Sequence, residues 1–222
     1  MMLAKSRTAS TPCLINRPNK ARFQHLVSRA FTLRLYLLLN TIGTLVAFYA
    51  SWRIGIFFLA YGMALWFYSH KLSKMMFVRE FAASFLAVTA FFSLLLYFQM
   101  ITPGFLVYGF SLFLILFARE VYKDIRSVKG DVILAYKTIA TTIGVIPSIR
   151  VFQVIVAISI LPNLLLISTM EKWPLILVMG LIGVLDLIAI LRLPNDVVFK
   201  RAWVHRLLQL IIALYIAGIV WL

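Results

Sequence analysis

Long apolar runs recur along this sequence and restrict the kinds of fold it can adopt. A helix needs about 20 mostly apolar residues to cross the roughly 30 Å hydrocarbon layer of a membrane. Apolar residues make up 63% of the 222 residues and charged residues only 13%, whereas a soluble domain carries about 25% charged residues. We therefore expect an all-α, multi-pass transmembrane helical bundle of about seven spans. The predicted spans are residues 31–50, 54–69, 81–101, 104–118, 151–169, 174–191 and 206–222.

The basic residues indicate how these spans are oriented, because cytoplasmic loops carry an excess of Lys and Arg. Twenty of the 22 lysines and arginines lie on one side, in residues 1–34, 71–79, 119–150 and 192–206, and the exceptions are Arg53 and Lys172. We therefore predict a cytoplasmic N-terminus and an external C-terminus. The net charge of +15 then follows mostly from topology, with attraction to anionic membrane lipid as a second effect. No nucleic-acid partner is expected.

The polar segments define the expected domain organisation. We expect residues 1–30 to form a polar cytoplasmic segment and residues 31–222 to form a single transmembrane domain. The N-terminus lacks the apolar core of a secretory signal, so targeting is expected to come from the spans, to the plasma (inner) membrane if the chain is bacterial. The predicted cytoplasmic loops are residues 70–80, 119–150 and 192–205.

The segment REVYKDIRSVKGD (119–131) concentrates ionisable residues in a chain that is otherwise mostly apolar. If it continues the preceding span as a helix, Glu120, Asp124, Ser127 and Asp131 lie on one face, at i, i+4, i+7 and i+11. Magnesium prefers oxygen ligands and usually takes one or two carboxylates together with substrate phosphates. This acidic stripe is therefore a candidate magnesium site.

A basic stripe adjoins the acidic one, about 100° further around the same predicted helix. It consists of Arg119, Lys123 and Arg126, and such side chains neutralise phosphate charge. The two stripes together are compatible with a magnesium-bound diphosphate. The alternative is a solvated charged segment whose basic residues anchor a helix end at the lipid headgroups.

Three short segments follow one another along the chain: INRPNK (15–20), FYSHKLSK (67–74), and REVYKDIRSVKGD followed by YKTIATTIG (136–144). In this order they resemble motifs of the UbiA family of intramembrane prenyltransferases. The third resembles the family's second aspartate-rich region, R-E-x-x-K-D-x-x-D-x-x-G-D followed by G-x-[KR]-T-[LI] and a later glycine. The matching residues there are Arg119, Glu120, Lys123, Asp124, Gly130, Asp131, Lys137, Thr138 and Gly144.

The resemblance implies a helical bundle, normally of nine spans, with a cytoplasmic cap around a magnesium-bound prenyl diphosphate. It implies that ionisation of the diphosphate gives an allylic cation, which a lipophilic acceptor captures. The implied catalytic residues are Asp124 and Asp131, and the implied magnesium ligands are Asp131, Asp124 and Glu120. The residues implied to bind the diphosphate are Arg119, Lys123, Lys137, Tyr68 and Lys74.

The sequence departs from the family pattern in two places. Seven spans are predicted where the family normally has nine, and residues 1–14, just before the INRPNK segment, contain no acidic residue. The first two spans and the first aspartate-rich motif, N-D-x-x-D-x-x-x-D, are therefore expected to be missing. In the second region, Ser127 stands where the family has an aspartate. Asp124 and Asp131 are separated by roughly 10.5 Å of helix rise, whereas Glu120 and Asp124 keep the i, i+4 spacing that lets two carboxylates share an ion.

These departures leave three hypotheses open. The first is an active prenyltransferase that transfers a polyprenyl group to a lipophilic acceptor in the membrane. The second is a non-catalytic descendant that binds a prenyl lipid or a partner protein. The third is an incomplete gene product, shortened at its N-terminus.

Other residues with metal-binding or ionisable side chains give weaker signals. Cys13, as the single cysteine, excludes an internal disulfide and a cysteine metal cluster. His25, His70 and His205 lie far apart in the sequence, so they are not expected to form a metal site. Asp186 falls inside a predicted span, where an ionisable residue indicates a function by default. The alternative for Asp186 is a solvated or paired side chain near the inner surface.

Overall fold

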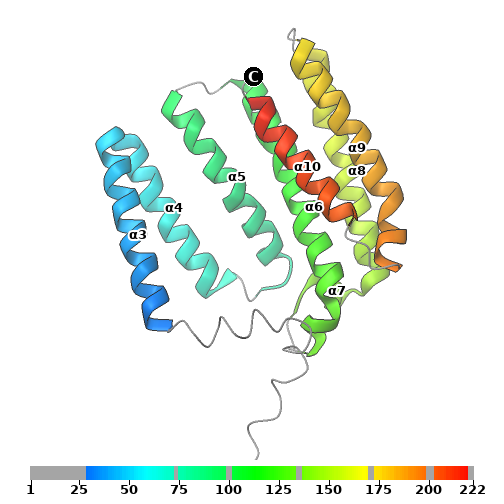
Figure 1. Ribbon diagram of the computed structural model, residues 1–222, viewed down its shortest axis with the longest axis horizontal. Coiled ribbons are helices and arrows are strands. Elements are labelled where there is room, and N and C mark those ends of the chain that lie inside the picture. The colour runs from blue at the N-terminus through cyan, green and yellow to red at the C-terminus, as the bar shows by residue number, and fades with distance from the viewer. Residues whose placement is uncertain are drawn as a thin grey trace, which may run out of the picture. The chain divides into compact units, whose positions relative to one another are not determined.

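The described part of the structure is entirely helical. The computed structural model describes residues 29–72, 75–98, 102–133, 137–169, 173–198 and 203–219, and these contain no strand. The helices (Figure 1) are α3 (Arg29–Ala50), α4 (Trp52–His70), α5 (Val78–Phe98), α6 (Pro103–Ile133), α7 (Ile139–Thr142), α8 (Val145–Thr169), α9 (Trp173–Val198) and α10 (Trp203–Gly218).

Each of the seven predicted spans coincides with a helix, which confirms the all-α fold class. Four of the described helices are long and apolar enough to cross a membrane, and α10 is a shorter apolar helix. The total of seven spans stays a prediction. The four long apolar segments are Leu33–Ala50, Pro103–Val132, Val145–Thr169 and Trp173–Leu193.

The chain divides into two compact units, Met1–Phe58 and Leu59–Leu222. Helix α4 begins in the first unit and ends in the second. In the first unit, Gly55 of α4 faces the ring of Phe48 on α3, and a Cβ atom at Gly55 would lie 2.3 Å from that ring. The missing side chain therefore allows the two helices to approach closely. The prediction of a single domain over 31–222 stays a prediction.

In the second unit, α6 is the central helix. It packs against α5, α8 and α10, and α8 and α10 also pack against α9 (Figure 1). The buried face of α6 includes Tyr108, Ile115 and Val121, which join side chains of α8, α9 and α10 in one apolar core. The core therefore holds α6 firmly along most of its length.

Helix α6 runs further than the predicted span 104–118. Its 31 residues correspond to a length of about 46 Å, which exceeds the roughly 30 Å hydrocarbon layer. Charged residues 119–131 therefore form the C-terminal part of this helix, because the apolar face that packs on the core continues through Val121, Tyr122 and Ile125. The segment predicted as a cytoplasmic loop is mostly helical in its described residues.

A group of polar side chains lies buried within the second unit. The hydroxyl groups of Ser111 on α6 and Tyr215 on α10 both donate to Asn163 Oδ1 on α8, each at 2.7 Å. Nearby on α8, the Ser159 hydroxyl lies 3.3 Å from Asp186 Oδ2 on α9. Ser159 is therefore a hydrogen-bond partner of Asp186, which the sequence alone did not identify. These contacts join four helices through side chains that would otherwise be unsatisfied in an apolar surrounding.

We expect Asn163→Leu to lower the free energy of unfolding by about 1–3 kcal/mol, because the buried Ser111 and Tyr215 hydroxyl groups lose the amide acceptor and keep only each other. The measurement is unfolding of the purified protein by sodium dodecyl sulfate, followed by circular dichroism. Asn40→Leu is the matched control, since Asn40 is exposed on α3. Equal stability of Asn163→Leu and the wild type would contradict the role given to this amide.

Candidate functional site

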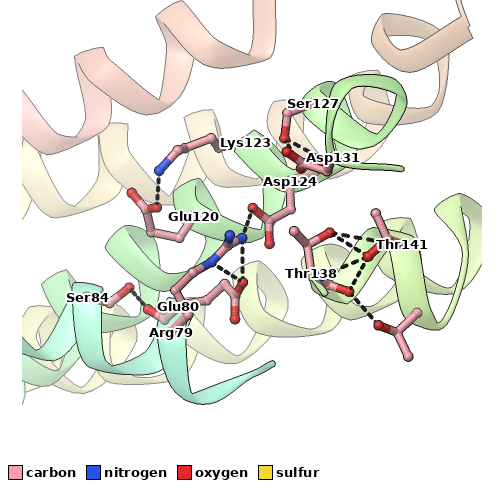
Figure 2. Close-up of polar contacts among 11 residues, drawn as sticks. Arg79, Glu80, Ser84, Glu120, Lys123, Asp124, Ser127, Asp131, Thr138 and Thr141 are labelled. Atoms are coloured by element: carbon pink, nitrogen blue, oxygen red, sulfur yellow. Dashed lines mark hydrogen bonds and ion pairs between the residues drawn. The ribbon is translucent and has the colours of Figure 1, made fainter. Parts of the chain in front are cut away.

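The charged end of α6 meets the first turn of α5 through one arginine. Arg79 Nη2 lies 2.6 Å from Asp124 Oδ1 and 2.8 Å from Glu80 Oε1. Arg79 Nε also donates to Glu80 Oε1 at 2.9 Å. Figure 2 shows the guanidinium group between the two carboxylates. Arg79 therefore links α5 and α6 at the point where α6 becomes charged.

The chain turns sharply just before this arginine. Phe77 has a φ of 60°, a left-handed conformation that is costly for a residue with a bulky side chain. The Arg79 N–H donates to Met75 O at 3.0 Å, which closes the turn. Helix α5 then begins at Val78, and Glu80 in its first turn is favourably placed relative to the helix dipole.

The three charged groups differ in exposure. The Glu80 and Asp124 side chains are 1% and 3% exposed, whereas Arg79 is 24% exposed. Burial lowers the pKa of the Arg79 guanidinium, but the nearby carboxylates of Asp124 and Glu80 outweigh this effect and raise the pKa above its ordinary value. Arg79 is therefore a permanent positive charge beside two buried carboxylates.

Glu120 and Lys123 form a separate ion pair near the surface. Lys123 Nζ lies 2.8 Å from Glu120 Oε2, and the lysine side chain is 68% exposed. Exposed pairs of this kind contribute at most about 1 kcal/mol. Tyr68, on the part of α4 that belongs to the second unit, lies within electrostatic reach of both residues. The structure thus places Tyr68, Glu120 and Lys123 in one neighbourhood.

Asp131 lies beyond Asp124 on the same helix and has its own partner. The Ser127 hydroxyl donates to Asp131 Oδ2 at 2.5 Å (Figure 2). Ser127 stands where the family pattern has an aspartate, so a hydroxyl donor replaces a second carboxylate at this position. Among the described residues, no three His, Cys, Asp or Glu side chains are grouped as a metal site.

Thr138, which matches the family's K-T pair, caps the short helix α7. Its hydroxyl accepts from the Thr141 N–H at 3.2 Å, and its own N–H donates to Thr141 Oγ1 at 2.8 Å. This reciprocal arrangement satisfies N–H groups that a helix start leaves free. The residue is buried, so its match to the motif has a structural explanation.

The remaining predicted site residues are placed as follows. Arg119 is half-buried on α6, and Lys137 is exposed just before Thr138. Lys74 lies outside the described residues. Arg79 and Glu80 are the two residues that the motif comparison missed. The sequence does show an Arg-Glu pair directly before the predicted span 81–101. The distribution of basic residues uses this arginine only as evidence for the orientation of the spans.

The comparisons with known proteins give one informative similarity. Digeranylgeranylglyceryl phosphate synthase of Thermococcus sibiricus (strain DSM 12597 / MM 739) is 25% identical to this chain over 172 residues, covering 76% of the chain and 61% of the synthase. The chain thus spans about three fifths of the synthase's length. No family model matches the chain, and no solved structure matches it. The similarity to the synthase supports the resemblance to prenyltransferases.

Proposed function

We propose that this chain transfers a prenyl group from a prenyl diphosphate to a lipophilic acceptor in the membrane. The observation that carries the proposal is the similarity to the Thermococcus sibiricus synthase over 76% of the chain. The structure supports it because cations and carboxylates gather where α5 begins and α6 ends, at one end of an apolar bundle. The charged side chains there suit a diphosphate group, and the adjoining apolar helices suit a hydrocarbon tail. The distribution of basic residues favours the cytoplasmic side for this end.

In this proposal the basic side chains bind the diphosphate. Lys123 is exposed and paired only at the surface, so its ammonium group moves onto a phosphate at little cost. Arg119 on the same helix and Lys137 just before α7 add positive charge. Tyr68 and Lys74 contribute from the segment that ends α4 and follows it.

The proposed magnesium ligands are Asp124, Asp131 and Glu120. Asp124 fits this role, because its Oδ2 is buried and has no hydrogen-bond partner among the described residues, and magnesium favours carboxylate oxygen. Glu120 and Asp131 each have one oxygen engaged, by Lys123 and by Ser127 respectively, and would bind through the other oxygen. Magnesium held by these carboxylates would supply positive charge to the departing diphosphate.

The reaction breaks the bond between the first prenyl carbon and the diphosphate oxygen, and the electron pair leaves with the diphosphate. The acceptor then forms a bond to the allylic carbon and loses a proton. Charges that already point at the leaving group need no reorganisation during this step. In this proposal the ion pair with Arg79 fixes the position of Asp124, so that its carboxylate needs no reorganisation to act.

The test is transfer by the purified full chain in lipid nanodiscs. Labelled geranylgeranyl diphosphate is supplied with magnesium and an extract of membrane lipids, and the labelled lipid product is separated and identified. We expect labelled lipid to accumulate with time and to require both the protein and the extract. Binding of the diphosphate without any labelled product would overturn the proposed transfer.

A further inference from the structure

Glu80 and Asp124 are two buried carboxylates that meet at the same nitrogen atom. Each places one oxygen on Arg79 Nη2, at 2.8 Å and 2.6 Å respectively. The separation of these two oxygens therefore cannot exceed the sum of the two distances. The other oxygens, Glu80 Oε2 and Asp124 Oδ2, are buried and have no hydrogen-bond partner among the described residues. The pair is drawn in Figure 2.

The charge of this group is not balanced. When both carboxyl groups are ionised they face one guanidinium, which leaves a net charge of −1 in a largely dehydrated place. The ammonium group of Lys123 is bound to Glu120 and is exposed to solvent. A buried charge without compensation is strongly unfavourable, so the pair must either share a proton or bind a cation at its two free oxygens.

The arrangement suits a divalent cation. Two oxygen ligands from separate carboxylates are a common minimum for Mg²⁺, which completes its shell with water or phosphate. A divalent ion changes the net charge of the group from −1 to +1, which favours an anionic partner. A single shared proton would only neutralise it.

Within α6, no other carboxylate replaces Glu80 in this arrangement. Ser127 removes the acidic residue one turn beyond Asp124, and Asp131 accepts from the Ser127 hydroxyl. Glu120 is paired with Lys123. Glu80 reaches Asp124 from α5 instead, so the second carboxylate comes from a different helix than the motif indicates.

We propose that Glu80 and Asp124 together bind one divalent cation, and that Arg79 positions the two carboxylates for it. The proposal deepens the proposed function and rests on it only in the expectation that the bound ion also contacts a diphosphate. Metal binding itself does not require transfer activity.

The test uses Mn²⁺ as the probe, because its paramagnetic resonance signal reports bound and free ion directly. The purified full chain in detergent is titrated with Mn²⁺ alone. We expect one bound ion per chain, with affinity lowered at least about tenfold by Glu80→Gln and by Asp124→Asn. Asp186→Asn, at a buried aspartate on α9 that is hydrogen-bonded to Ser159, is expected to change the affinity less than about twofold, because this side chain lies outside the charged end of the bundle.

Several results would overturn the proposal. They are the absence of Mn²⁺ binding, binding that survives Glu80→Gln, and binding that is lost in Asp131→Asn alone. A shared proton instead of a metal predicts that Glu80→Gln stabilises the protein while no Mn²⁺ binds. If either variant fails to fold, the unfolding temperature of the wild type decides, since it should rise with Mg²⁺ and not with Na⁺ at equal ionic strength.

The outcome is separable from that of the transfer reaction. Mn²⁺ binding that depends on Glu80, without labelled lipid in the transfer assay, would leave the cation site in place and refute the transferase. Prenyl transfer that is unaffected by Glu80→Gln would support the transferase and refute the cation site.

Discussion

Replacing Arg79 by methionine is expected to lower the free energy of unfolding by about 3–5 kcal/mol, the cost of removing one partner of a buried ion pair. The loss is large because both Glu80 and Asp124 remain buried, with exposed fractions of 1% and 3%, and lose the cation between them. Unfolding by sodium dodecyl sulfate, followed by circular dichroism, measures the change.

Lys123→Met is the matched control, since it removes a cation from the same end of the bundle. Its pair with Glu120 is exposed, so the expected loss is below about 1 kcal/mol. Arg79→Lys should recover part of the lost stability, because it restores the charge without the planar group that spans both carboxylates. Equal effects of Arg79→Met and Lys123→Met would contradict the buried ion pair as the link between α5 and α6.

Asp124→Asn is expected to reduce prenyl transfer by about 100-fold or more, comparable to removing one preorganised electrostatic group from an active site. The asparagine has nearly the same shape, so the loss would reflect charge. It would be measured as the initial rate of labelled lipid formation at saturating magnesium.

Asp186→Asn makes the same chemical change at another buried aspartate, on α9 beside Ser159. Because this residue lies outside the charged end of the bundle, its rate should stay within about threefold of the wild type, in contrast to the loss expected at Asp124. A similar loss in both variants would indicate damage to the fold and would remove Asp124 from the proposed site.

The helical fold could be predicted because the bilayer sets the length of an apolar helix. Every predicted span coincides with a helix, including the short α10. The length of α6 was underestimated, since hydropathy ends at the charged residues while the buried face continues to Ile125. Hydropathy indicates which residues lie in the hydrocarbon layer and does not show where a helix ends. Helix α6 therefore continues to Ile133, beyond its apolar residues.

The partners of the site residues could not be predicted from spacing within one helix. The stripe from Glu120 to Asp131 suggested that its carboxylates act together. In the structure Glu120 pairs with Lys123, Asp131 accepts from Ser127, and Asp124 crosses to Arg79 on α5. The last contact depends on how α5 packs against α6, which a spacing rule does not contain. Glu80 was missed for the same reason.

Prenyl transfer is tested most directly by comparing two products of one reaction. Purified wild-type chain is incubated with labelled geranylgeranyl diphosphate, magnesium and membrane lipid acceptors, and both pyrophosphate and prenylated lipid are quantified. We expect one pyrophosphate released for each prenyl group transferred, with both products greatly reduced in Asp124→Asn. Neither product above the background without protein, or equal yields from the wild type and Asp124→Asn, would contradict it.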